Sequence, residues 1–162
     1  MNSSWQDRVA DFWRTADGSN VEETLVAMKA LVAELDETDA RASFELASVH
    51  DFLGLEQEAI PLYNKAIDLG LEGNAREKAV IQLASSLRNV GNPIDAIALL
   101  QATSFSDEAQ GAASVFLALA KFDMGDKAEV LRLAREDSYP ADGLYARSIK
   151  FYLSHLDTAE LN

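Results

Sequence analysis

The chain has 162 residues, of which 48% are hydrophobic and 25% are charged. This composition is typical of one folded globular domain, and its apolar stretches are well short of the ~20 residues that a transmembrane helix needs. The formal net charge of −13 disfavours nucleic acid and anionic membranes as partners, because their phosphate groups would be repelled. The absence of cysteine excludes disulfides and thiolate chemistry, and the first residues lack the pattern of a secretory signal. We therefore expect a cytoplasmic protein.

The spacing of apolar residues predicts helices along almost the whole chain. Apolar side chains recur at i, i+3, i+4 and i+7, and prolines occur only at positions 61, 93 and 140. Helix-capping residues and glycines divide the chain into about nine helices. Their expected ranges are 4–16, 21–35, 40–53, 56–69, 75–90, 93–102, 107–124, 126–136 and 141–156.

The first two helices carry the clearest start signals. Ser3 with Gln6, and Asn20 with Glu23, have the spacing of a capping box, in which two side chains satisfy free amides at a helix start. Each helix also has an apolar stripe that is expected to face inward. The stripes are Trp5, Val9, Phe12 and Trp13 in the first helix, and Val21, Leu25, Met28, Val32 and Leu35 in the second.

A short pattern recurs three times along the rest of the chain. A Leu-Ala pair is followed seven residues after its Ala by Gly, and five residues later by a small residue. The glycines are 37 and 34 residues apart, and this period predicts stacked helical hairpins that are each too small to fold alone. The three copies are Leu46-Ala47, Gly54, Ala59; Leu83-Ala84, Gly91, Ala96; and Leu117-Ala118, Gly125, Val130.

Each residue type in the pattern has a physical role in such a hairpin. The alanines let two helices approach closely, because a larger side chain would push the helix axes apart. The leucines fill the space between the helices. Gly54, Gly91 and Gly125 are expected to adopt the left-handed conformation that ends a helix without steric cost.

The pattern resembles the signature of the tetratricopeptide-repeat family. The later copies keep the Leu-Ala and Gly positions and lose the aromatic residues of the family. Residues 35–101 are especially similar to a group of small bacterial tetratricopeptide proteins. The first copy matches best, through Leu46, Ala47, His50, Ala59, Tyr63 and Ala66.

The resemblance implies an all-α fold, a right-handed α-solenoid of antiparallel hairpins that forms one domain over residues 1–162. A degenerate leading hairpin (1–37) is followed by repeats at 40–70, 75–103 and 107–137 and by a closing helix at 140–157. The resemblance also implies a scaffold or adaptor without catalytic activity, which binds a protein or peptide in the concave groove lined by the first helix of each hairpin.

Polar residues on these first helices are the candidate binding residues. On the helices at 40–53 and 75–90 they are spaced to share one face, with Phe52 on the same face as the first set. Three basic residues on one polar face of an acidic protein can receive a carboxylate or an extended peptide. The alternative is a polar face that only meets solvent. The candidates are Arg41, Glu45, Ser48, Lys78, Gln82, Ser85, Arg88 and Asn89.

The third repeat places two large apolar residues, Phe116 and Leu119, on the matching face. They either form the floor of a binding pocket or are covered by the last helix. Cover is the favoured interpretation, because a terminal repeat needs a cap over its apolar surface. The covering residues would be Leu144, Ile149, Tyr152 and Leu153.

The sequence carries no pattern typical of catalysis, of a metal site or of a bound cofactor. The two histidines, His50 and His155, lie in different helices, and His50 occupies a packing position of the repeat. We expect a protein or peptide partner, with the chain as a monomer or a homodimer. The alternative function is a self-assembling structural protein that pairs through the helix of Trp5 and Trp13.

Overall fold

The computed structural model describes residues 4–130, 132, 150–152 and 154–155. These residues contain seven complete helices and no strand, and they include short helical stretches at 128–130 and 150–152. The predicted helices at 126–136 and 141–156 lie largely outside the described residues. The seven helices are α1 (Trp5–Thr15), α2 (Val21–Val32), α3 (Ala40–Phe52), α4 (Glu56–Asp68), α5 (Gly73–Asn89), α6 (Pro93–Ala102) and α7 (Asp107–Asp123).

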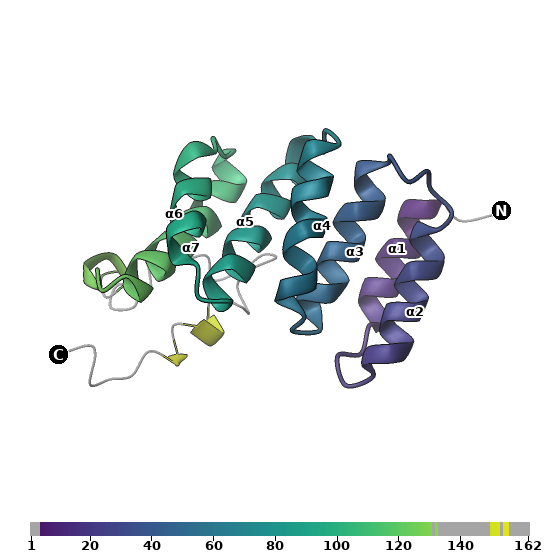
Figure 1. The fold of residues 1–162 in the computed structure, drawn as a ribbon, viewed down its shortest axis with the longest axis horizontal. Helices are drawn as coiled ribbons and strands as arrows, with labels where there is room; N and C mark the ends of the chain where they lie inside the picture. Colours follow the sequence, from purple (N-terminus) through teal and green to yellow (C-terminus); the bar gives the residue numbers. More distant parts are fainter. Residues whose placement is uncertain (1–3, 131, 133–149, 153, 156–162) are drawn as a thin grey trace. The chain divides into compact units, whose positions relative to one another are not determined.

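The chain forms two compact units, residues 1–86 and residues 87–162, and the boundary between them falls inside α5. In the first unit, α1 to α4 stand side by side and successive helices reverse direction at the connecting turns (Figure 1). In the second unit, α6 packs against α7. The all-α fold of antiparallel hairpins is therefore confirmed, whereas the single domain over residues 1–162 stays a prediction.

The capping box of α1 lies one residue later than the sequence predicted. The Ser4 hydroxyl accepts a hydrogen bond from the Asp7 amide (3.1 Å), and the Asp7 carboxylate accepts one from the Ser4 amide (2.9 Å). The pair Ser4–Asp7 replaces the predicted Ser3–Gln6, because a carboxylate is a stronger acceptor than an amide at the positively polarised start of a helix. The predicted cap at Asn20 is confirmed, since its side chain accepts from the Glu23 amide.

Apolar residues of α1, α2 and α3 form the core of the first hairpins. Met28 and Val49 are fully buried, and the predicted stripe of α1 packs against them. The prediction was wrong for Val21, which is 42% exposed. The buried face of α2 starts three residues later, at Thr24, whose hydroxyl donates to the carbonyl of Asp17 (2.8 Å).

The recurring alanines and glycines have the roles that the sequence predicted. The backbone at Gly54 is left-handed (φ 72°), as it is at Gly91 (84°) and Gly125 (92°). After Gly54 the amide of Leu55 donates back to the carbonyl of His50 (2.9 Å), which closes the end of α3. The alanines that separate the helices are at most 1% exposed; they are Ala47, Ala59, Ala84, Ala96 and Ala118.

The substitution Gly54→Ala is expected to lower the free energy of unfolding by about 1 kcal/mol, because an L side chain is strained at this positive φ. An added Cβ would meet no atom within 4 Å, so the cost is conformational and not steric. The measurement is urea unfolding followed by circular dichroism.

The matched control is Gly18→Ala. Gly18 is outside the left-handed region, and its added Cβ would lie at an ordinary 3.6 Å from the Phe52 ring. Equal destabilisation by the two substitutions would contradict the conformational account.

Candidate functional site

In residues 1–86, the first helices of the successive hairpins are α1, α3 and α5, and they meet at Glu45. The indole N–H of Trp13, on α1, donates to Glu45 Oε2 on α3 (2.7 Å). Burial raises the pKa of Glu45, while the Trp13 hydrogen bond and the nearby positive charge of Lys78, on α5, act to lower it. The Glu45 carboxylate therefore links three helices through a hydrogen bond and a charge interaction.

An exposed aromatic ring packs against the same tryptophan that holds this carboxylate. Phe52 is 47% exposed, and its ring stands edge-on to that of Trp13 with the ring centroids 5.8 Å apart. Because Trp13 contacts both Glu45 and Phe52, the predicted face of α3 is shared by a carboxylate and an apolar surface. Large exposed aromatic residues are common anchors of protein interfaces.

Arg41 lies one helical turn before Glu45 and keeps about half of its side chain exposed. Its guanidinium forms an ion pair with Asp39 (2.5 Å) and lies 5.4 Å from the centre of the Trp5 ring. The hydrogen bonds with Arg41 lower the pKa of Asp39. Arg41 is thus held near the start of α3 by a solvent-exposed ion pair of small net energy.

Three of the candidate residues are less accessible than a groove lining would be. Ser48 and Ser85 are 7% and 9% exposed, and Gln82 is partly buried. Among the described residues, Ser48 Oγ and Gln82 Oε1 are buried and have no hydrogen-bond partner. Because little of these three side chains is exposed to solvent, they are poorly placed to contact a partner directly.

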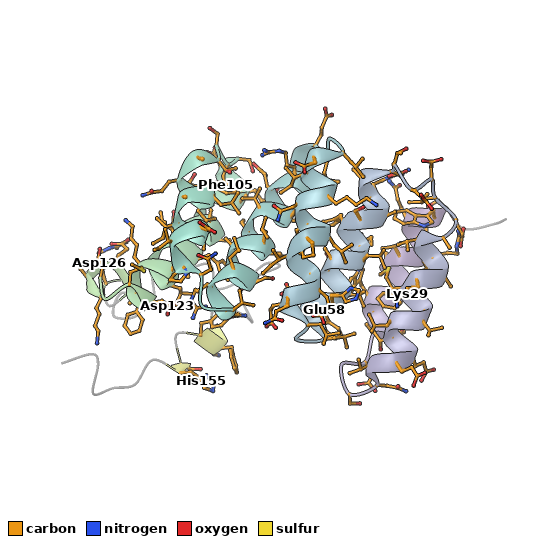
Figure 2. The ribbon with its side chains drawn as sticks, viewed as in Figure 1. Lys29, Glu58, Phe105, Asp123, Asp126 and His155 are labelled. Carbon is orange, nitrogen blue, oxygen red and sulfur yellow. The ribbon has the colours of Figure 1, made fainter. Side chains whose placement is uncertain are left out.

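The last two candidates belong to the second unit and are engaged there. Arg88 Nε lies 2.6 Å from Asp123 Oδ2, at the C-terminal end of α7 (Figure 2). The ring of Tyr152 lies over the Arg88 guanidinium, with Arg88 Cζ 4.5 Å from the ring centre, and Asn89 Nδ2 donates to the Tyr152 hydroxyl (3.1 Å). Burial raises the pKa of Asp123, and the adjacent Arg88 opposes this shift.

Tyr152 also contacts the apolar face of α7 at Phe116. Phe116 and Leu119 are 3% and 1% exposed, and the Tyr152 ring stands edge-on to Phe116 at 6.1 Å. This contact agrees with the expectation that the closing segment covers Phe116. The other expected covering residues, Leu144, Ile149 and Leu153, lie outside the described residues.

Asp51 is a partly buried carboxyl group that the sequence analysis missed. It accepts hydrogen bonds from the hydroxyls of Ser86 on α5 (2.9 Å) and Tyr63 on α4 (3.5 Å). Burial raises the pKa of Asp51 to about 6, and the negative charge of Glu56 adds to the shift. A signal was present, because Asp51 follows the buried Ala47 by four residues and so lies on the helix face that packs inward.

The remaining polar groups show local structural roles. His50 Nδ1–H donates to the carbonyl of Leu46, one turn earlier on α3 (2.6 Å). In the described part of the chain, no three His, Asp or Glu side chains gather as a metal site would require. None of the helices described here combines the length and apolarity needed to cross a bilayer.

Paired antiparallel helices with alanine contacts and glycine-ended first helices define a helical-repeat protein of the α-solenoid class. A family model for the tetratricopeptide repeat matches residues 40–156, and the chain belongs to the tetratricopeptide-repeat family. Proteins of this family are generally non-catalytic scaffolds that bind protein partners. A search of curated proteins found no relative that matches the chain.

The substitution Asp51→Asn is expected to flatten the pH dependence of stability between pH 4 and pH 7. In the folded wild type the pKa of Asp51 is about 6 against a usual value of 3.8. Stability from the neutral carboxyl is therefore fully present below pH 3.8 and is lost as the pH rises through 6. The shift corresponds to about 3 kcal/mol, which the wild type loses over this range and the asparagine variant keeps.

The measurement is urea unfolding of both proteins at intervals of pH. Glu58→Gln, which changes an exposed residue of α4, is the control for removing one carboxylate (Figure 2). If Asp51→Asn and Glu58→Gln change the pH profile equally, Asp51 does not carry the dependence.

Proposed function

We propose that this chain is an adaptor that binds a protein or peptide partner through the first-helix face of residues 1–86. We define the first-helix face by Arg41, Glu45 and Phe52 of α3 and Lys78 of α5. One observation carries the proposal: Arg41, Glu45 and the half-exposed Phe52 share one face of α3, and Lys78 on α5 acts on Glu45, in a family that generally binds proteins. The docking mode would be a peptide or helix laid along the concave side of the first helices.

The chemistry of this face favours a peptide with both a carboxylate and an apolar side chain. Arg41 and Lys78 are exposed cations, and a guanidinium can bind a carboxylate through two parallel hydrogen bonds. The exchange of Asp39 for a ligand carboxylate costs little, because exposed ion pairs contribute less than about 1 kcal/mol. An apolar side chain of the peptide would pack against Phe52 and Trp13.

The net charge of the chain influences which flanking residues the partner carries. At −13 the protein attracts positive charge at long range. Basic residues on either side of the bound carboxylate would therefore speed association, and salt would slow it.

The other predicted binding residues take different roles in this proposal. Ser48, Gln82 and Ser85 are buried or partly buried, so they would support the face from below. Arg88 and Asn89 are already in contact with Tyr152 in the second unit.

Self-assembly through α1 is less well supported. The indole N–H of Trp5 donates to the carbonyl of Leu31 (2.9 Å), and that of Trp13 donates to Glu45. Both indoles are therefore used inside the first unit. Pairing of two copies stays a prediction that static light scattering can measure.

The double substitution Arg41→Glu with Lys78→Glu is expected to reduce capture of specific partners by at least about tenfold, since each lost charge-assisted hydrogen bond is worth about 1.5–3 kcal/mol. The measurement is affinity capture from a native lysate by the full chain, with quantitative mass spectrometry of the captured proteins.

The matched control is Lys29→Glu with Lys65→Glu, on α2 and α4. It changes the net charge by the same amount at exposed positions of the second helices of the hairpins. Partners that are lost with the first pair and kept with the control identify the first-helix face. Equal loss with both pairs, or no loss with either, would show that this face does not bind them.

A further inference from the structure

In the second unit, the side chain of Tyr152 packs against residues of α5 and α7, which are the first helices of their hairpins. Tyr152 contacts Arg88 and Asn89 on α5 and Phe116 on α7. Arg88 and Asn89 follow Lys78 and Gln82 along α5, on the side of the helix that the sequence marks for partners. The chain therefore places an aromatic side chain of its own where a ligand side chain would be expected.

The contacts of Tyr152 with Arg88, Asn89 and Phe116 have the form of ligand recognition. Its ring lies over the Arg88 guanidinium at a distance typical of a cation–π interaction. Its hydroxyl accepts a hydrogen bond from Asn89, and its ring edge meets Phe116. Arg88 thus contacts the face of the tyrosine ring, Asn89 contacts its hydroxyl, and Phe116 contacts its edge.

The fit of Tyr152 to Arg88 is incomplete. Arg88 Nε is next to Asp123, but Arg88 Nη1 is buried and has no hydrogen-bond acceptor among the described residues. A buried donor of a charged group without an acceptor is costly. A peptide that supplied a tyrosine together with a carboxylate or carbonyl oxygen would satisfy Nη1, which the ring of Tyr152 cannot do.

The neighbours of Tyr152 are open to solvent. Phe151 is 56% exposed, and the side chains of Lys150, Ser154 and His155 are also exposed. Among the described residues 150–152 and 154–155, Tyr152 is therefore the side chain that contacts α5 and α7.

We propose that Tyr152 is an internal ligand of the second unit. It occupies a tyrosine-binding surface made by Arg88, Asn89, Phe116 and Asp123, and a tyrosine-containing peptide of a partner must displace it in order to bind there. This inference goes beyond the proposed function, because it concerns the second unit and its test uses a segment of this chain as the probe.

The test measures binding of a synthetic peptide with the sequence of residues 147–158 to the full-length chain, by fluorescence anisotropy. Wild type is expected to bind the peptide at least about tenfold more weakly than the Tyr152→Ala variant, whose surface is vacated, since loss of a cation–π contact with a hydrogen bond is on this scale. A peptide in which the tyrosine is replaced by alanine is expected not to bind either protein.

Variants of α5 locate the surface. In the Tyr152→Ala background, Arg88→Lys keeps the charge beside Asp123 but loses the planar group under the ring, and it should weaken peptide binding about tenfold. Arg76→Lys, an exposed position on the same helix, is the matched control and should leave binding unchanged. Equal effects of the two substitutions would overturn the assignment to Arg88.

Two further measurements keep the proposal open to refutation if Tyr152→Ala perturbs the fold. Tyr152→Phe keeps the ring and removes only the hydroxyl that Asn89 contacts, so it should bind the added peptide more tightly than wild type and less tightly than Tyr152→Ala. Static light scattering should give the mass of one chain for wild type. Equal peptide binding by all variants, binding by none, or a doubled mass that indicates exchange between two copies would each overturn the internal ligand.

Discussion

The close approach of paired helices is the constraint on which the rest of this structure depends. Ala47 and Ala59 are fully buried in the hairpin of α3 and α4, and Gly54 turns the chain between them. A larger side chain at either alanine would force the helices apart and open a void that the neighbouring side chains cannot fill. The hydrogen bond from Tyr63 on α4 to Asp51 on α3 spans this close contact.

Buried carboxyl groups join consecutive first helices. Glu45 links α3 to α1 through Trp13, and Asp51 links α3 to α5 through Ser86. Both groups have raised pKa values because burial disfavours their charged forms. Each therefore costs stability when ionised, while its hydrogen bonds join helices that are otherwise held by apolar contacts. The first-helix face is built on this polar framework.

The two units differ in what occupies their first helices. In residues 1–86 the exposed side chains of Arg41, Lys78 and Phe52 are available to solvent. In residues 87–162 the guanidinium of Arg88 lies between Asp123 and the ring of Tyr152. The neighbours of each cation on a repeat helix therefore decide how much of its side chain reaches solvent.

The sequence by itself determined the helical hairpins, the buried alanines and the left-handed glycines, because these follow from local spacing and backbone sterics. It also placed the candidate binding residues on shared helix faces. Only the tertiary structure decided that Arg88 is paired with Asp123, that Ser48 is buried, and that Asp51 meets Ser86 from 35 residues away. Periodicity assigns a residue to a face, but burial and pairing depend on which side chains of distant helices fill the space opposite that face.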